Sequence, residues 1–180
     1  SMDYQETFIN YSVEDTAKNI ADELIFEGSS SNLDAAQSVT AIGGIVNVSE
    51  AAEIQDIQGF NDYSSNYNIE DSSAAIINDL STASEYGVSQ VIVTDTVDIH
   101  DGMILSDLEV SLDANFGALS NSGDVDFDVA GSASEIISLA SDLSGASNVY
   151  VTDGSVDVSD AFYLAQLEYS LKADDASADV

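Results

Sequence analysis

The chain of 180 residues contains 34 acidic residues and only two lysines, so its formal net charge is −32 at neutral pH. Phosphate recognition and binding to anionic membranes both depend on Lys and Arg, which excludes nucleic acid and membrane surfaces as direct partners. No cysteine is present, which excludes a disulfide framework and thiolate metal sites. Repulsion among so many carboxylates predicts a fold that needs salt or divalent cations.

A similar pattern occurs three times along the chain, over residues 11–60, 67–112 and 127–171. Each repeat opens with an aromatic-x-apolar triplet, continues into a helical pattern and a β-branched segment, and closes with a second helical pattern. Internal similarity at this spacing is typical of modular arrays. We interpret residues 1–10 as a leader or cloning remnant and residues 172–180 as a tail.

The first helix of each repeat carries a narrow apolar stripe. In the first repeat Asp15 is a suitable N-cap, and Ala17, Ile20, Ala21 and Leu24 follow at helical spacing. The stripes of the second and third repeats comprise Ile76, Ile77 and Leu80, and Ile136, Ile137 and Ala140. In the third repeat Ser132 and Glu135 form a capping-box pattern, which moves the cap by one residue relative to Asp15.

A β segment follows in each repeat, at residues 39–48, 91–93 and 149–151. The last two are β-branched or aromatic triplets followed by Thr-Asp and then by alternating apolar and acidic residues. Residues 152–155 contain Asp-Gly, which suits either a tight hairpin or a corner between two faces of a solenoid.

The second helix of each repeat is expected to start at a polar residue, Ser49, His100 or Ser159. Acidic residues just inside the start complement the positive end of the helix dipole. The predicted apolar stripes are Ala51, Ile54 and Ile57; Ile104, Leu105, Leu108 and Leu112; and Ala161, Leu164, Leu167 and Leu171.

This alternation predicts an α/β fold in which strand-helix-strand-helix repeats stack side by side. Strands of successive repeats would form a parallel sheet covered by helices, as in a solenoid-like array, because one repeat alone cannot bury its apolar face.

The run Tyr-Ser-Val-Glu-Asp-Thr-Ala-Lys-Asn-Ile-Ala at residues 11–21, with Val-Thr-Asp-Gly at 151–154 and Val-Asp-Val-Ser-Asp-Ala at 156–161, resembles a known repeat family. It is similar to the tandem "DTAANIA" repeats of very large secreted bacterial surface proteins. Those repeats often accompany calcium-binding nonapeptide arrays and adhesin modules. Gly131 stands where the motif has Asp. The resemblance implies an exported, non-catalytic architectural segment.

Aspartate clusters are the only candidates for site chemistry. They comprise Asp153, Asp157 and Asp160; the near-equivalent Asp95, Asp98 and Asp101; and Asp124, Asp126 and Asp128. Alternation places the last three on one strand face, where only a cation or open solvent tolerates them. Calcium needs six to eight oxygen ligands, which such loops supply in part with carbonyls and water. The alternative is a solvated acidic surface with helix caps, and both interpretations stay open.

His100 is the only histidine, and the other two repeats place Ser at its position. We therefore interpret it as a helix cap rather than a general base. No nucleophile-elbow pattern accompanies any serine, and we expect no enzymatic activity.

Several aromatic residues lie in polar surroundings where a ring can stack on a sugar: Tyr4, Phe8, Tyr63, Tyr67 and Tyr86. Tyr11, Tyr67 and Phe127 open the repeats in register, so packing between repeats explains these three better.

The sequence thus predicts a structural segment of a secreted bacterial surface protein, of adhesin-stalk or surface-layer type. Its partners would be neighbouring repeats of a longer chain, and calcium would strengthen it. The alternative is an adhesin module that binds a glycan or another surface. A halophilic cytosolic origin also explains the acid excess.

Overall fold

The computed structural model describes residues 10–27, 32–116, 124–143 and 145–175, and alternates strands with helices. The strands are β1 (Ser12–Asp15), β2 (Ser38–Val46), β3 (Asn66–Asp71), β4 (Val88–Asp98), β5 (Asp124–Gly131) and β6 (Ala146–Val151). The α-helices are α1 (Ala17–Glu27), α2 (Val48–Gln55), α3 (Ser73–Asn78), α4 (Leu80–Ala83), α5 (Ile99–Phe116), α6 (Ala133–Leu139) and α7 (Val158–Asp175). Short 3-10 turns are η2 (Asn32–Ala35), η3 (Asp62–Ser64) and η4 (Ala140–Asp142).

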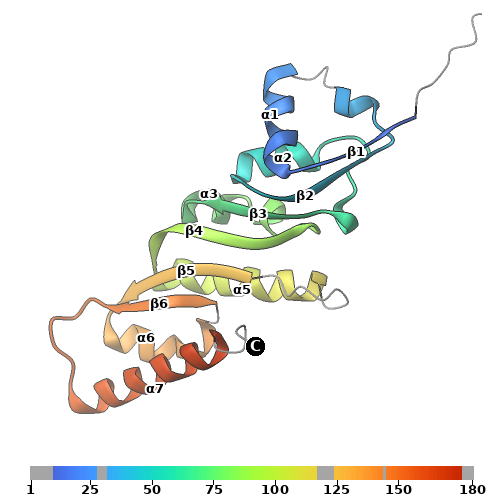
Figure 1. Ribbon diagram of the computed structural model, residues 1–180. Coiled ribbons are helices and arrows are strands. Elements are labelled where there is room, and N and C mark those ends of the chain that lie inside the picture. Colours follow the sequence, from blue (N-terminus) through green and yellow to red (C-terminus); the bar gives the residue numbers. More distant parts are fainter. Residues whose placement is uncertain (1–9, 28–31, 117–123, 144, 176–180) are drawn as a thin grey trace, which may run out of the picture.

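The six strands form one open sheet in chain order, β1-β2-β3-β4-β5-β6, and every neighbouring pair is parallel (Figure 1). Each strand therefore pairs only with the strands directly before and after it in the sequence. The predicted α/β class and the parallel sheet are confirmed.

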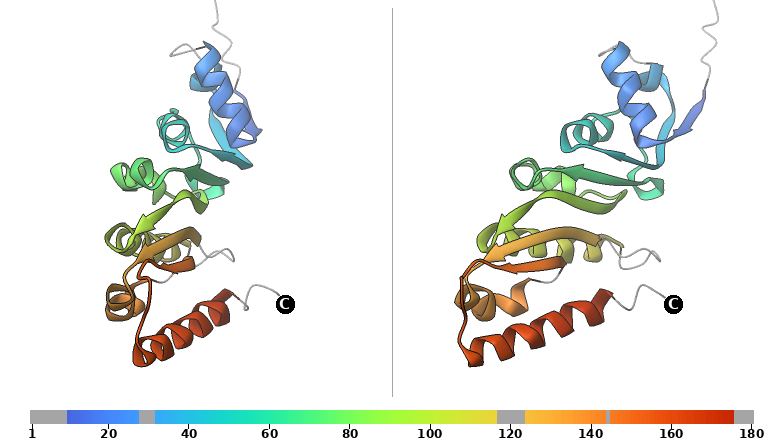
Figure 2. Two further views of the ribbon diagram at one scale, coloured as in Figure 1. Left: turned by 90° about the vertical axis from the view of Figure 1, so that its left-hand side faces the viewer. Right: turned by 60° about the vertical axis from the view of Figure 1, so that its left-hand side comes forward.

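Helices cover one face of this sheet. The left-hand view of Figure 2 shows α2, α3, α5 and α6 on the same side of the strands, with the opposite face uncovered. Successive helices also pack against one another, as α1 does on α2 and α6 on α7. Parallel sheets are usually covered on both faces, so the uncovered face is unusual and must be polar.

The core lies between the sheet and the helices and follows the predicted periodicities. In β5 the side chains of Val125, Phe127 and Val129 are buried, whereas the acidic residues between them face the open side. On the helices Ile20, Ile54 and Leu105 are fully or almost fully buried, as the 3.6-residue spacing predicts. The stripe predicted for α7 is not buried, because Ala161 is exposed and Leu164 and Leu167 are half-buried. Tyr67 and Phe127 are buried in register, which confirms their packing role.

The first helix of each repeat has its N-cap at the same position. Ser72 and Ser132 accept from the backbone N–H three residues later, and Ser132 completes a capping box with Glu135 as predicted. The Thr16 hydroxyl accepts from Asn19 N at 3.3 Å, so the cap of α1 is Thr16. The assignment to Asp15 is wrong, and the cap does not move between repeats.

The second helix of each repeat starts one residue earlier than predicted. The caps are Asn47, Asp98 and Asp157, each of which accepts from the backbone N–H three residues on. His100 is the second residue of α5 and is exposed, so its assignment as a cap is wrong. The same applies to Ser49 and Ser159, each two residues beyond the cap.

The β segment of each repeat is one strand and not a hairpin. β4 runs from Val88 to Asp98 and pairs with β5 on both sides of an irregularity between Ile92 and Thr96. Residues 152–157 contain no strand, so the hairpin interpretation is wrong, and these residues form the corner before α7.

Candidate functional site

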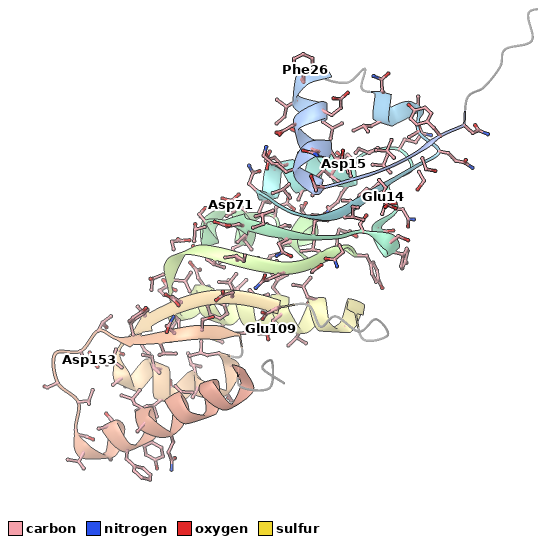
Figure 3. The ribbon with its side chains drawn as sticks, in the orientation of Figure 1. Glu14, Asp15, Phe26, Asp71, Glu109 and Asp153 are labelled. Carbon is pink, nitrogen blue, oxygen red and sulfur yellow. The ribbon has the colours of Figure 1, made fainter. Side chains whose placement is uncertain are left out.

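A strand and the helix that follows it form one strand-helix unit, so each repeat contains two units. Carboxylates at the carboxyl-terminal edge of the sheet accept hydrogen bonds from the helix of the preceding unit. Asp95 accepts from Ser73 N at 2.6 Å and from the Ser73 hydroxyl at 2.8 Å. Asp71 accepts from Val48 N at 3.2 Å, and Asp153 from Ala133 N at 2.8 Å. Figure 3 shows Asp71 and Asp153 at this edge. In each case the donor is the first residue of a helix, whose N–H has no partner within the helix.

Glycine occupies the matching position at the two other junctions. A Cβ on Gly44 would lie 3.4 Å from Ala17 N, the first helical N–H of α1. A Cβ on Gly131 would lie 3.4 Å from the side chain of Ile99, the first residue of α5. The departure of Gly131 from the repeat motif therefore removes one cap between units, and Asp98 caps α5 from within its own unit.

The remaining acids of the first two predicted metal clusters serve their own helices. Asp98 accepts from His100 N at 2.9 Å and Asp101 N at 3.0 Å. Asp157 accepts from the Ser159 hydroxyl at 2.7 Å and from Asp160 N at 2.9 Å, and the hydroxyl contact is the main cause that lowers its pKa. Asp101 and Asp160 lie in the first turns of α5 and α7.

The third cluster lies on the open face of β5, as its alternation predicts. Asp126 accepts from the Ser147 hydroxyl. Asp128 accepts from Asn148 Nδ2 at 2.7 Å and from the Tyr150 hydroxyl at 3.3 Å. The nearby Asp128 charge raises the pKa of Tyr150. Asp124 begins the strand and is exposed.

The structure does not bring these acids together as a coordination sphere. Within the described ranges, no three His, Asp or Glu side chains form a group able to hold a metal ion. Six of the nine aspartates instead accept hydrogen bonds from backbone N–H groups, hydroxyls or an amide: Asp95, Asp98, Asp126, Asp128, Asp153 and Asp157. The arrangement favours the alternative to calcium, an acidic surface with helix caps.

A ladder of polar side chains continues this surface onto neighbouring strands. Asn68 Nδ2 donates to Gln90 Oε1 at 3.1 Å across β3 and β4, and the Ser89 hydroxyl donates to Asn66. Cross-strand amide, hydroxyl and carboxylate pairs therefore make the uncovered face compatible with water. Ile42, 45% exposed, is an apolar exception on β2.

The candidate sugar-binding aromatics separate into buried and exposed residues. Tyr67 is fully buried, and Gln55 Nε2 donates to its hydroxyl at 2.9 Å. Burial raises its pKa to about 12. Tyr63 is 68% exposed and lies against Tyr86, with ring centroids 4.7 Å apart. Tyr4 and Phe8 lie outside the described residues.

A groove of about 540 Å³ lies at the β1–α1 end of the sheet. Its lining includes Val13 and Asp15 of β1, Asn19 and Phe26 of α1, and Leu33. Figure 3 shows Asp15 near the start of α1 and Phe26 toward its other end. The groove contains no histidine, and its acids come from the same strand-helix unit.

Sequence reasoning missed two features of these junctions. The capping box of Asn47 and Glu50 has an Asn-x-x-Glu spacing that a search for caps could have detected. The backward contact of Asp71 has no local signal, because it joins residues 23 positions apart.

A comparison with protein families, curated proteins and solved structures finds no match for this chain. In the described part of the chain, every helix is too short or too polar to cross a membrane.

Proposed function

We propose that this chain is a non-catalytic structural segment of a secreted bacterial surface protein, of adhesin-stalk or surface-layer type. Its strand-helix units stack in a solenoid-like array, and its partners are neighbouring repeats of a longer chain. The observation that supports this role is the sheet order, in which each strand pairs only with its neighbours in the sequence. Linear order with nearest-neighbour contacts is the design of repeat proteins that act as spacers or extended surfaces.

The backward caps support the same role. Asp71, Asp95 and Asp153 each complete the helix of the unit before their own strand. At these three junctions a unit therefore reaches its full hydrogen bonding only when the next unit is present. This dependence favours a continuous array over a set of independent small domains.

We also propose that cations stabilise the array. The net charge is −32, and in the described residues Lys18 forms ion pairs with Asp22 and Glu50. Calcium or another divalent cation would relieve repulsion among carboxylates more effectively than sodium at the same concentration, because it carries two charges. The chain resembles repeats that often occur together with calcium-binding arrays, so calcium is the first cation to test.

Truncation tests the array role. A chain shortened after Gly131 lacks α6, β6 and α7 but keeps the complete β1-to-β5 sheet. We expect it to retain strand and helix signals in circular dichroism and to unfold at lower urea concentration than the full chain. Complete loss of structure would contradict nearest-neighbour stability.

Labelling of intact cells tests the location. Antibodies against the chain should bind unbroken cells of the source organism, and brief protease treatment of those cells should remove the signal. A signal that appears only after lysis would contradict surface exposure while leaving the array role intact.

Glycan binding is the second candidate, and the exposed Tyr63 ring against Tyr86 favours it. Aromatic faces on a rigid scaffold are suited to stack on sugar rings. If this function is correct, Tyr63→Ala should abolish retention on a carbohydrate matrix that retains the wild type. Tyr150→Ala, which changes an exposed tyrosine on β6, is the matched control.

A further inference from the structure

The helix at the β6 end of the sheet, α7, exposes positions that are buried in its counterpart α2. Alignment on the caps Asn47 and Asp157 makes Val158 the counterpart of Val48. Val48 is 5% exposed, whereas Val158 is 89% exposed. Ala161 is likewise exposed, although its counterpart Ala51 is fully buried. The difference arises because β3 covers α2, whereas no described strand follows α7.

The chain just before α7 also lacks a partner that its counterpart has. In β4, Thr96, Val97 and Asp98 pair with Asp128, Val129 and Ala130 of β5. The equivalent residues 155–157 belong to no strand. Val156 is 37% exposed, whereas Val97 is 4% exposed. This end of the sheet therefore presents both an unpaired backbone and an uncovered apolar helix face.

The β1–α1 end has the complementary features. The segment from Tyr11 to Asp15 has the same pattern as residues 67–71 of β3, aromatic-x-apolar-Glu-Asp. Tyr67 and Ile69 are fully buried, whereas Tyr11 and Val13 are only half-buried. The groove of about 540 Å³ next to Val13 and Ile20 lies on this side.

Asp15 corresponds to Asp71, whose two carboxylate oxygens have different partners. Asp71 Oδ1 accepts from Ser72 N at 2.8 Å, and Oδ2 accepts from Val48 N. Asp15 Oδ1 likewise accepts from Thr16 N at 2.7 Å. Within the described ranges, its Oδ2 has no donor from a preceding helix.

We propose that a second copy of this chain docks head to tail, with its β1 beside residues 155–157 and its α1 beside α7. The inference rests on the proposed array role and names the partner that extends the array. In this register Ser12, Val13 and Glu14 of one copy face Ser155, Val156 and Asp157 of the other, as β5 faces β4. Asp15 Oδ2 then accepts from Val158 N, as Asp71 accepts from Val48 N.

The alternation of two kinds of strand-helix unit, which differ in the cap of their helix, supports a second copy of the chain as the partner. Units with the Thr16, Ser72 and Ser132 caps alternate with units capped by Asn47, Asp98 and Asp157. The last unit belongs to the second type and the β1–α1 unit to the first, so head-to-tail docking preserves the alternation. Such a contact is heterologous and leaves both outer ends open, and longer assemblies can grow from it.

Charge decides when the contact forms. The register places Glu14 beside Asp157, and each copy has a net charge of −32. Docking is therefore weak at low ionic strength and strengthens as salt screens the carboxylates. Sedimentation of the full chain should show a mass near 18.9 kDa in low salt and at least twice that mass in molar salt.

Two variants separate this contact from general salting-out. Val158→Asp adds a negative charge to the face that β1 would cover, beside Glu14 and Asp15 of the other copy, and should weaken association about tenfold or more. Val110→Asp makes the same change at an exposed position of α5 and should leave association nearly unchanged. Both positions are exposed in the single chain, so circular dichroism should show equal folding. Equal association of the two variants would overturn the proposal.

Cross-linking tests the register. Ser12→Cys and Ser155→Cys chains, mixed in molar salt, should give a dimer with a short bismaleimide, because the wild-type chain contains no cysteine. Each variant alone should not cross-link. A Ser12→Cys chain that links to itself indicates symmetric pairing of β1 edges and overturns the proposal, as does a monomer at every salt concentration. A monomer whose truncated form still folds would leave the array role standing and reject only this docking.

Discussion

Asp95, in the irregular part of β4 between Ile92 and Thr96, holds Ser73 at the start of α3 through both the backbone N–H and the hydroxyl group. The two residues are 22 positions apart and belong to successive strand-helix units. One carboxylate thereby joins a helix start, a strand and the interface between units.

Removal of this carboxylate should destabilise the fold. Asp95→Ala leaves the first N–H of α3 without its acceptor, and loss of a helix cap typically costs about 1 kcal/mol. Urea denaturation should therefore show a lower free energy of unfolding. Asp107→Ala, at an exposed position of α5, is the control and should change stability little. Equal effects from the two substitutions would mean that the Asp95 contact contributes no stability.

The Asp95 contribution should depend on pH. The hydrogen bond from the Ser73 backbone is the main cause that lowers the pKa of Asp95 below its ordinary 3.8. A lowered folded-state pKa means that the stabilisation is present above the unfolded value and disappears as pH falls through the folded value. The difference in unfolding free energy between wild type and Asp95→Ala should therefore be constant from pH 7 to pH 5 and shrink below about pH 4. A difference that persists at pH 2 would contradict this linkage.

Gly87 should not tolerate a side chain. Its φ is +94°, and a Cβ would lie 3.0 Å from Asp62 O and from Ser65 Cβ. We expect Gly87→Ala to cost about 1 to 3 kcal/mol, because the left-handed backbone and the close contact both oppose a side chain. Gly154→Ala is the control, since a Cβ there has no atom within 4 Å. Thermal melts of the two variants should differ clearly.

Tyr67 should make the fold sensitive to alkali. Burial raises its pKa to about 12, so the neutral phenol favours the folded state. This stabilisation is complete below the unfolded value near 10 and is lost as pH rises through the folded value. At neutral pH, Tyr67→Phe should lower the unfolding free energy by about 1 kcal/mol, because the bond from Gln55 is lost. Above pH 10 this difference should reverse, since phenylalanine cannot ionise, and denaturation at pH 11 would check it.

Calcium should raise the melting temperature. Comparison of millimolar calcium chloride with a chelator, at sodium chloride that equalises ionic strength, separates ion binding from screening. Magnesium chloride at the same concentration separates calcium preference from a general effect of divalent charge. A melting temperature that depends only on ionic strength would reject bound calcium and leave screening as the source of stability.

Sequence periodicity predicted the elements and the buried stripes because each depends on local spacing. Ile20, Ile54 and Leu105 are buried as expected, and the three acids of β5 share one face. The sequence pattern predicts the starts of α2, α5 and α7 one residue too late, because polar residues inside the first turn resemble caps. Four of the nine acids assigned to metal sites, Asp95, Asp98, Asp153 and Asp157, accept from helix N–H groups instead. A contact such as Asp153 to Ala133 N depends on strand register. Register is set by packing between units, which no single repeat encodes.

The strict neighbour-to-neighbour order of the strands has a mechanical consequence. β1 and β6 are opposite edges of the sheet, and Figure 1 shows the chain passing from one to the other without return. A pulling force between these edges acts across the strands and loads one ladder at a time, in the manner of a zipper. We expect such a segment to lengthen stepwise under tension and to recover by rewinding from whatever units stay intact.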